Sequence, residues 1–428
     1  MVTVVRARVA HTPCNPFVSD PGLETFEDGA VAFAEGRILA CGSYEDVRSG
    51  HPNAEVLDGR DAFLLPGFVD CHVHYPQIGV IGAMGLELLD WLRLRSLPEE
   101  ARLADPVYAA SVADAFVRAL ARNGTTTALV FGSHFPLAQE ALFAAAAESG
   151  LRVFSGLVVS DRGLIPSLEV SVDAAVDASR ELIGRWHGRG LLRYAVTPRF
   201  AVSCSEAMLD ACGSLAREAP DVLITTHLNE SPGEIELVGS LFPWARDYLE
   251  TYERFDLVGP RSVFAHDVHV GESELRRLAS SGAAVAHCPS SNAFLGSGTF
   301  PLRRHLDAGV RVALGTDVGA GTGLSLLNEG LMAYQVQMLA GSDGLRLTPA
   351  HLLWLATGAG AAALGVSDSV GDLSVGKSAD FMLIRPPAGS TLEAVLERSE
   401  SLEDALGVLF TLAHEESIAE VRVAGRVL

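Results

Sequence analysis

The chain has 428 residues, of which 48% are hydrophobic and 20% charged, and its formal net charge is −21. This composition predicts a soluble globular protein with a large core, and the length favours one large α/β domain with a smaller one beside it. The acidic balance argues against a nucleic-acid partner or an anionic membrane surface, because both require basic patches.

The expected absence of a signal peptide or membrane span, together with the scattered cysteines, favours the cytoplasm. The N-terminal apolar run is too short for a signal peptide, and no segment approaches the roughly 18–20 continuous apolar residues of a membrane span. The six cysteines are scattered without a C-x-x-C pair, so free thiols in a reducing compartment are expected. We therefore expect a cytoplasmic protein with no membrane partner.

Residues 1–66 are predicted to form short strands separated by turns. The segment 30–43 has the pattern of a β-hairpin, with Glu35 and Gly36 at its turn. At the other end of the chain, residues 370–384 and 418–428 show the same strand-like texture. The simplest arrangement is one small β-rich domain made from residues 1–66 and 370–428, with residues 67–369 inserted between them.

Strand-like and helix-like segments alternate between these ends. Helices are expected at 106–124 and 137–150, each ended by a glycine. Alternation of apolar strands with helices predicts a parallel (β/α)₈ TIM barrel, and a doubly wound open sheet is the alternative. No G-x-G-x-x-G follows the first strand, which disfavours a dinucleotide-binding version of that sheet. The eight expected strands are 62–74, 125–132, 152–160, 191–200, 222–230, 262–270, 283–292 and 310–319.

Histidine and carboxylate side chains gather where these strands end, which is the end at which barrels carry their active sites. Neutral imidazoles with one carboxylate suit Zn²⁺ or Fe²⁺, whereas Mg²⁺ and Ca²⁺ prefer oxygen ligands. Such a site activates water, and Glu230 is placed to move a proton between that water and a leaving group. The residues at the strand exits are His72, His74, His227, Glu230, His266, His269, His287 and Asp317.

The order of these donors resembles that of the amidohydrolase superfamily. Binuclear members bridge two metals with a carboxylated lysine on the fourth strand. The segment 191–200 contains no lysine, and Lys377 is the only lysine in the chain. The resemblance therefore implies a centre with one metal ion per subunit, with zinc expected and Fe²⁺ as the alternative.

Within that superfamily the chain resembles the guanine deaminase family over nearly its whole length. The H-x-H and "GTD" segments are shared widely, whereas Tyr75–Gln77, Thr197–Phe200 and Ser290–Gly298 are more specific. The matching blocks, in order, are "PGFVDCHVHYPQ", "LLDWL", "NGTTTALVF", "VTPRFAVSCS", "THLNE", "AHCPSSNAFLGSG" and "LGTDVGAG".

The resemblance implies hydrolysis of guanine to xanthine and ammonia by a metal-activated water. Asp317 would take a proton from the water, and Glu230 would protonate the ring and help the amine leave. His227 and Glu230 would also contact the substrate, a small purine. Gln77 and Arg199 would bind the purine edges and Phe200 would pack on the base. The implied metal ligands are His72, His74, His227 and His266, with Asp317 at or near the metal.

Alternatives remain open on the sequence. A related aminohydrolase could act on another aminopurine, a pterin or a triazine-like ring, and an inactive assembly protein would be expected to have lost ligands. The family resemblance also implies a homodimer.

The remaining candidate residues near the strand exits are interpreted mainly as structural. His269 is expected to be a satisfied loop histidine, and His287 a residue that supports the metal ligands. His134 is either pocket-lining or structural, and Trp91 is expected to pack in a loop that covers the site. Asp267 stands where the family usually has glycine, so its carboxylate either perturbs nearby pKa values or faces outward.

Overall fold

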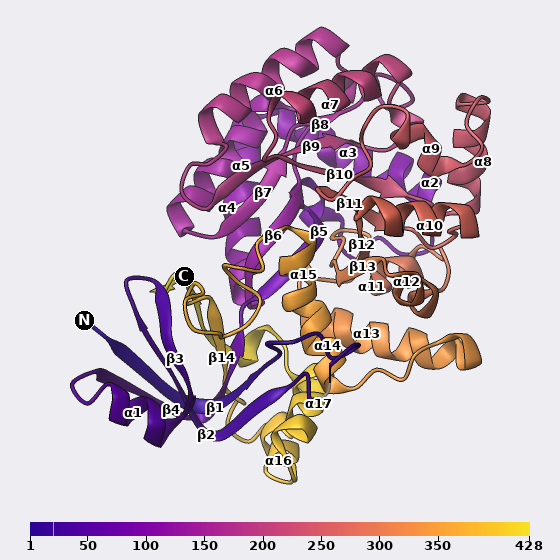
Figure 1. Ribbon diagram of the computed structural model, residues 1–428. Helices are drawn as coiled ribbons and strands as arrows, with labels where there is room; N and C mark the ends of the chain where they lie inside the picture. Colours follow the sequence, from indigo (N-terminus) through magenta and orange to yellow (C-terminus); the bar gives the residue numbers. More distant parts are fainter. Residues whose placement is uncertain (20) are drawn as a thin grey trace.

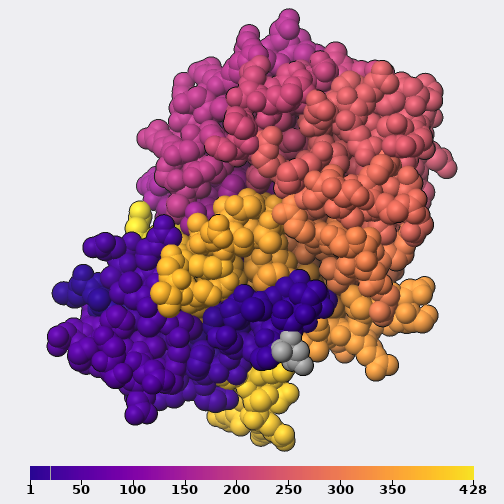
Figure 2. All heavy atoms as spheres, in the orientation of Figure 1, coloured from indigo at the N-terminus to yellow at the C-terminus, as the bar shows by residue number. Residues whose placement is uncertain are grey.

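Two sheets organise the chain, as the computed structural model in Figure 1 shows for residues 1–19 and 21–428. One is a parallel barrel in the middle of the sequence. The other is a seven-stranded sheet formed by both chain ends, with the order β16-β15-β14-β4-β1-β2-β3. In the space-filling view the indigo N-terminal residues lie against the orange segment that follows the barrel (Figure 2). No helix among the described residues is long and apolar enough to cross a bilayer.

The barrel is built from parallel strands in the order β5-β6-β7-β9-β10-β11-β12-β13, with β8 beside β9. Every residue of β5 and β6 is buried, as expected for strands covered on both faces. The ring is completed after β13, where Asp317 N donates to His72 O at 2.8 Å and His74 N donates to Val318 O at 3.0 Å. This arrangement confirms the barrel prediction, and the open-sheet alternative is wrong. The strands are β5 (Phe68–His74), β6 (Thr125–Phe131), β7 (Arg152–Gly156), β8 (Val158–Val159), β9 (Leu192–Pro198), β10 (Leu223–Leu228), β11 (Ser262–His266), β12 (Ala284–His287) and β13 (Arg311–Leu314).

The helices around the barrel begin and end at local signals in the sequence. The Asp105 side chain caps α4 by accepting from the amides of Val107 and Tyr108. Gly124, at φ 81°, follows the end of α4, and Gly150, at φ 84°, ends α5, so the glycine stops are confirmed. The helices are α4 (Pro106–Arg122), α5 (Pro136–Ser149), α6 (Val172–Trp186), α7 (Glu206–Glu218), α8 (Pro232–Leu241), α9 (Tyr248–Glu253), α10 (Glu272–Ser281), α11 (Pro289–Phe294), α12 (Leu302–Ala308), α13 (Leu326–Leu339), α14 (Pro349–Ala356) and α15 (Gly358–Ala363).

The end sheet contains the predicted hairpin. Glu35 (φ 53°) and Gly36 (φ 76°) connect β2 to β3, and both take the left-handed backbone that such tight turns require. One expectation for the C-terminal segment needs correction, because only Phe381–Ile384 of the range 370–384 is a strand. Helices α16 and α17 lie between β14 and β15. The elements are β1 (Thr3–His11), β2 (Glu24–Ala34), β3 (Arg37–Ser43), α1 (Tyr44–Gly50), β4 (Glu55–Pro66), β14 (Phe381–Ile384), α16 (Thr391–Leu396), α17 (Leu402–Leu412), β15 (Ile418–Val423) and β16 (Arg426–Val427).

The expected strand 62–74 is in fact two strands in two different sheets. β4 ends at Pro66 in the end sheet, and β5 begins at Phe68 in the barrel. Gly67 lies at the junction, where a Cβ atom would come within 2.2 Å of the Thr126 side chain. The close approach of the Thr126 side chain leaves no room for a Cβ atom here, and the chain changes sheet at this residue.

Short helical segments cover the mouth of the barrel after β5. They bring apolar side chains such as Leu88 and Trp91 over the strand exits, where both are buried. The segments are η1 (Tyr75–Val80), α2 (Leu88–Trp91), the π-helical turn η2 (Leu92–Ser96), α3 (Leu97–Ala101) and η3 (Arg102–Ala104). Other single turns are η4 (Pro166–Leu168), η5 (Ala201–Ser203), η6 (Gly341–Asp343) and η7 (Glu415–Ser417).

Candidate metal centre and active site

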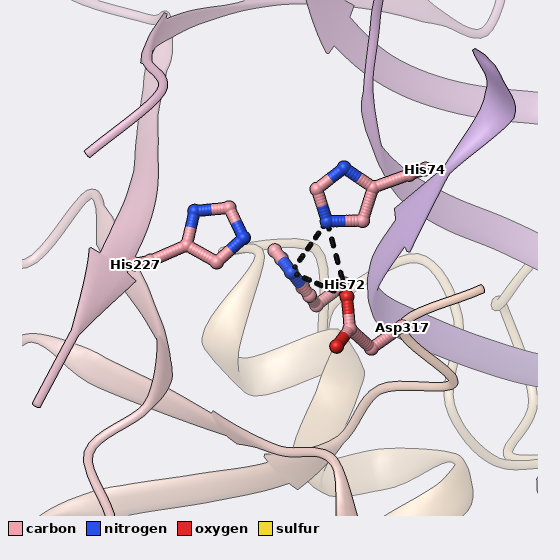
Figure 3. A group of neighbouring side chains, drawn as sticks. All are labelled: His72, His74, His227 and Asp317. Carbon is pink, nitrogen blue, oxygen red and sulfur yellow. Dashed lines mark hydrogen bonds and ion pairs between the residues drawn. The ribbon is translucent and has the colours of Figure 1, made fainter. Parts of the chain in front are cut away.

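Four side chains from three parts of the barrel point at one spot in its mouth (Figure 3). His72 and His74 come from β5, His227 from β10, and Asp317 follows β13. One possible ligand atom from each lies within 4.8 Å of the corresponding atoms of the other three. Asp317 Oδ1 is 3.1 Å from His72 Nε2 and 3.0 Å from His74 Nε2.

The spacing and chemistry of this cluster fit a divalent metal ion. His72 Nε2 and His74 Nε2 are 3.1 Å apart. Donors that share an ion at about 2.0–2.1 Å stand roughly 3–3.4 Å from each other, so the measured separations match. Imidazole nitrogens with one carboxylate are the donors that Zn²⁺ and Fe²⁺ prefer. The cluster can therefore accept one such ion.

His266, at the end of β11, adds a further donor to this cluster. Its Nε2 is buried without a hydrogen-bond partner among the described residues, and it is 3.7 Å from Asp317 Oδ2. Its Nδ1 is 3.0 Å from the side-chain oxygen of Asn292. A donated Nδ1–H proton leaves the lone pair on Nε2, which then faces the cluster.

His227 is oriented in the same way. Its Nδ1 is 2.7 Å from the carbonyl oxygen of Arg199, which can only accept, so Nδ1 carries the proton. Nε2 is then the free lone pair. Backbone and amide acceptors therefore select the tautomers of His227 and His266 that can bind a cation.

The pKa values of the cluster also suit the binding of a cation. Desolvation lowers the pKa of His72 to about 4 and that of His227 well below its ordinary value, so both imidazoles are neutral at pH 7. Burial opposes ionisation of Asp317, but hydrogen bonds with His72 and His74 hold the pKa of that carboxyl well below its usual range. Neutral imidazoles around one carboxylate are ready for a divalent cation.

The strand exits carry left-handed backbone at residues other than glycine. Asn229 (φ 49°), His266 (φ 73°), Asp267 (φ 48°) and Asp317 (φ 49°) all take this conformation. Such residues cost free energy and occur where the surrounding structure holds them, often at functional sites. Here they turn the chain at the ends of β10, β11 and β13, next to the donor cluster.

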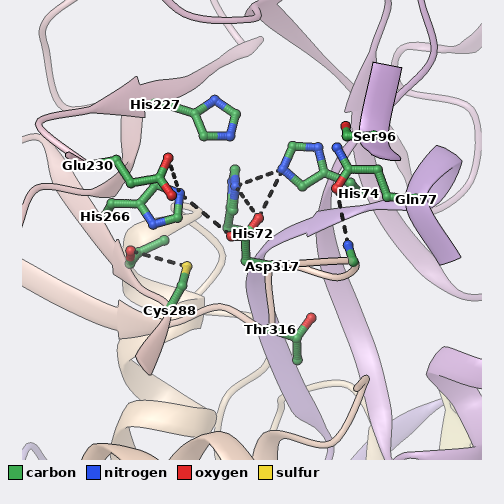
Figure 4. A network of polar contacts seen from close by, with 12 residues as sticks. His72, His74, Gln77, Ser96, His227, Glu230, His266, Cys288, Thr316 and Asp317 are labelled. Carbon is green, nitrogen blue, oxygen red and sulfur yellow. Dashed lines mark hydrogen bonds and ion pairs between the residues drawn. The ribbon is translucent and has the colours of Figure 1, made fainter. Parts of the chain in front are cut away.

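A cavity with about 380 Å³ of empty space opens onto the donor cluster. Glu230, Gln77, Arg199 and Phe200, the residues expected to act on or bind a substrate, all line it. Figure 4 shows Glu230 beside His266, with Gln77 on the opposite side beyond His74. The full lining is His74, Gln77, Leu88, Trp91, Leu92, Arg199, Phe200, His227, Glu230, His266, Leu295, Asp317 and Ala320.

The pKa values of Glu230 and Asp317 shift in opposite directions. Burial, followed by the charges of Glu234 and Asp317, raises the pKa of Glu230 well above its ordinary value. Its Oε2 is 3.5 Å from His266 Nε2. The cavity thus holds two carboxyls whose environments push their pKa values apart, which is the pairing used for acid–base chemistry.

Glu100, which sequence reasoning missed, connects two of the lining residues. It lies on α3, is 3% exposed, and accepts hydrogen bonds from Gln77 Nε2 (2.8 Å) and Arg199 Nη1 (2.7 Å). In the sequence it belongs to "LPEEA", a pattern typical of an exposed helix start. No local signal distinguishes it from its neighbour Glu99.

The peripheral histidines lie outside the cavity lining. His269 Nε2 bonds Ser297 O at 2.7 Å, as expected for a satisfied loop residue. His134 is buried, 3.4 Å from Glu100, so it has a supporting place rather than a lining one. Neither ring nitrogen of His287 has a hydrogen-bond partner among the described residues, so its expected supporting role stays a prediction. Its ring stacks on Phe300, with centroids 4.4 Å apart.

One further expectation needs correction. Of the two alternatives for Asp267, the outward-facing one is wrong: its carboxylate is fully buried, accepting from Asn229 at 2.9 Å and lying 2.8 Å from His305 Nε2. These contacts hold its left-handed backbone, which explains how a residue other than glycine is accommodated. Trp91 packs after β5 and lines the cavity, in agreement with its expected place over the site.

Comparisons with known proteins agree with this geometry. The amidohydrolase family matches residues 63–428. A probable guanine deaminase of Deinococcus radiodurans is 55% identical over 99% of this chain and 98% of its own length. The structure of Escherichia coli guanine deaminase superposes with a TM-score of 0.94 at 37% identity, covering 100% of this chain and 99% of that one. Guanine deaminase from C. acetobutylicum, with bound guanine in its active site, superposes with a TM-score of 0.91 at 26% identity over 100% of both chains. The chain therefore belongs to the amidohydrolase family and, within it, to the guanine deaminases.

Proposed function

We propose that this protein hydrolyses guanine to xanthine and ammonia with the help of one zinc ion per subunit. One observation carries the proposal. A single cavity brings the histidine–aspartate cluster, Glu230, and the polar pair Gln77 and Arg199 together. The relatives named guanine deaminase, one of them with guanine bound, support the same substrate.

The metal would be held by the four histidines, with Asp317 at or near it. Bound zinc supplies an activated water as nucleophile at neutral pH. Asp317 is ionised, so it can accept the proton that this water gives up. The ligands proposed are His72, His74, His227 and His266.

Glu230 supplies the other half of the proton transfer. Burial raises its pKa and favours its protonated form, which can donate a proton to a ring nitrogen of guanine as C2 is attacked. As C2 becomes the carbonyl carbon of xanthine, Glu230 takes up the proton of the added hydroxyl and passes it to the departing amine. The proton held on Asp317 then returns to Glu230. One water is consumed and one ammonia released, so both carboxyls end the cycle in their starting states.

Gln77, Arg199 and Phe200 would bind the base. A planar guanidinium forms directed hydrogen bonds with the acceptors of a purine edge, and Gln77 offers both a donor and an acceptor. Phe200, which is 5% exposed, packs on the flat ring, while His227 and Glu230 border the reacting carbon. A base that leaves these buried polar groups unpaired would be rejected strongly.

An ammonia-release assay with guanine, adenine, cytosine and pterins tests the proposal, with metal content measured on the same sample. We expect turnover of guanine and one divalent metal per chain. Absence of a divalent metal, or turnover of cytosine without guanine, would contradict the proposal. Preferential turnover of another aminopurine, a pterin or a triazine-like ring would establish the alternative substrate class. The metal analysis also separates zinc from Fe²⁺.

We further propose that the protein is a cytoplasmic homodimer. The six cysteines are all free thiols in the structure, which supports a reducing compartment. Light scattering should give twice the chain mass. We also propose the division into a barrel domain (67–369) and an end domain (1–66 with 370–428), supported by the end sheet, which takes strands from both termini.

A further inference from the structure

Glu100 lies behind the cavity wall and contacts both residues that face a purine edge. Its side chain does not line the cavity, whereas Gln77 and Arg199 do. Oε1 accepts from Gln77 Nε2 at 2.8 Å and from Ser96 Oγ at 2.8 Å. Oε2 accepts from Arg199 Nη1 at 2.7 Å. One carboxylate therefore joins the segment after β5 to the segment after β9.

The contact with Glu100 sets which way the Gln77 amide points. An ionised carboxylate can only accept, so it bonds the NH₂ end of the amide. The carbonyl end of Gln77 accepts from the amide of Gly319 at 3.1 Å. Both ends are thus assigned by partners that cannot exchange roles. A fixed amide leaves one donor and one acceptor position for a ligand.

Glu100 also neutralises the charge of Arg199. Burial opposes ionisation of Glu100, but the charges of Arg199 and of the nearby His134 hold the pKa of that carboxyl well below its usual range. The Glu100–Arg199 pair is buried, with side chains that are each 4% exposed. The guanidinium can therefore donate to a ligand without presenting an uncompensated positive charge to the cavity.

We infer that Glu100 is a positioning residue that makes this site select neutral purines over purine anions. It acts through Gln77 and Arg199 and touches no substrate atom itself. With the carboxylate in place, the wall of the cavity offers directed donors and little net charge. Without it, the wall would offer a cation, which attracts anionic oxopurines. This inference rests on the proposed guanine site and extends it to substrate charge.

The test compares Glu100→Gln with the parent protein, both loaded with zinc. Calorimetry measures the binding of hypoxanthine, a neutral oxopurine, and of xanthine at a mildly alkaline pH at which it is a monoanion. In E100Q we expect KM for guanine to rise, and hypoxanthine to bind more weakly, by about 10- to 100-fold, the range for losing a hydrogen bond to a charged group. Binding of the xanthine anion should hold or strengthen, so the ratio of the two dissociation constants shifts at least about tenfold.

Glu99→Gln is the matched control, since it makes the same change in the neighbouring residue. Glu99 is buried and bonds Arg102 and Tyr108, not Gln77 or Arg199. E99Q should leave the ratio unchanged. Glu100→Asp provides a second variant that keeps the charge but shortens the reach. It should raise KM and leave the ratio within about threefold of the parent, which also tests the inference if E100Q does not fold.

Two results would overturn the inference. Equal weakening of both ligands in E100Q would show a merely structural role, and a shifted ratio in E100D would show that charge is not the cause. Failure of the parent protein to turn over guanine would instead refute the proposed function. The two failures are therefore distinguishable, because ligand binding and turnover are measured separately.

Discussion

Replacing Glu230 with glutamine separates proton transfer from metal binding. Glu230 is 3% exposed, and glutamine has nearly the same shape, so no void is created. Burial raises the pKa of the carboxyl well above its ordinary value, and glutamine matches the charge of the protonated form that burial favours. The substitution removes only the transferable proton. We expect a melting temperature close to that of the parent protein.

The loss in turnover can be bounded from the role assigned to this residue. General acid–base catalysis by one side chain contributes about 10²- to 10⁴-fold, which corresponds to roughly 2.7–5.5 kcal/mol of activation free energy. We expect kcat for guanine to fall within this range. Metal content should be unchanged, because Glu230 is not among the proposed ligands and glutamine leaves the four histidines and Asp317 in place.

The assay is ammonia release at saturating guanine, with elemental analysis of the same preparation. Glu329→Gln is the matched control, since burial raises the pKa of Glu329 to about 8 and its side chain does not line the cavity. It should retain turnover within a few-fold. Loss of metal in E230Q would make Glu230 a ligand, and a kcat within tenfold of the parent value would refute its role in proton transfer.

Two further predictions concern stability. Asp105→Ala removes the side-chain acceptor for the amides of Val107 and Tyr108 at the start of α4, so unfolding should become easier by about 1 kcal/mol, with turnover at 25 °C retained; an unchanged denaturation midpoint would contradict the capping role. Burial raises the pKa of Glu329 from 4.5 to about 8, so the stability this carboxyl contributes is fully present below pH 4.5 and is lost as pH rises through 8. Denaturant unfolding should show a decline on the order of 3–5 kcal/mol across this window that is absent in E329Q, and parallel pH profiles of the two proteins would refute it.

Local sequence patterns were sufficient to predict structure where the neighbouring residues in the chain determine the backbone conformation. The hairpin at Glu35–Gly36 and the helix ends near Gly124 and Gly150 depend on backbone preferences of single residues, and they were predicted correctly. The strand at 62–74 was predicted wrongly, because β4 and β5 pair with different strands in two sheets, and Gly67 at their junction lies against the Thr126 side chain. That contact joins residues far apart in the sequence and leaves no periodic signal.

Some features of the candidate site could likewise be predicted from the sequence, and others could not. A parallel barrel places the ends of all its strands at one mouth, so the chain order of His72, His227 and Asp317 already implied that they meet. The tautomers of His227 and His266, the buried place of Asp267 and the contacts of Glu100 followed only from tertiary structure.

The amino-acid sequence thus determined the alternation of strands and helices and the side chains delivered to each strand end, because hydrophobic period and glycine position are local properties. Tertiary structure decided which acceptors orient those side chains and how their charges are balanced. The physical reason is that Glu100 hydrogen-bonds to Gln77 and Arg199 only after the segments over the barrel mouth have packed together. Burial there raises the pKa of Glu230, whereas hydrogen bonds with His72 and His74 outweigh burial at Asp317 and lower its pKa, which no property of either residue alone could show.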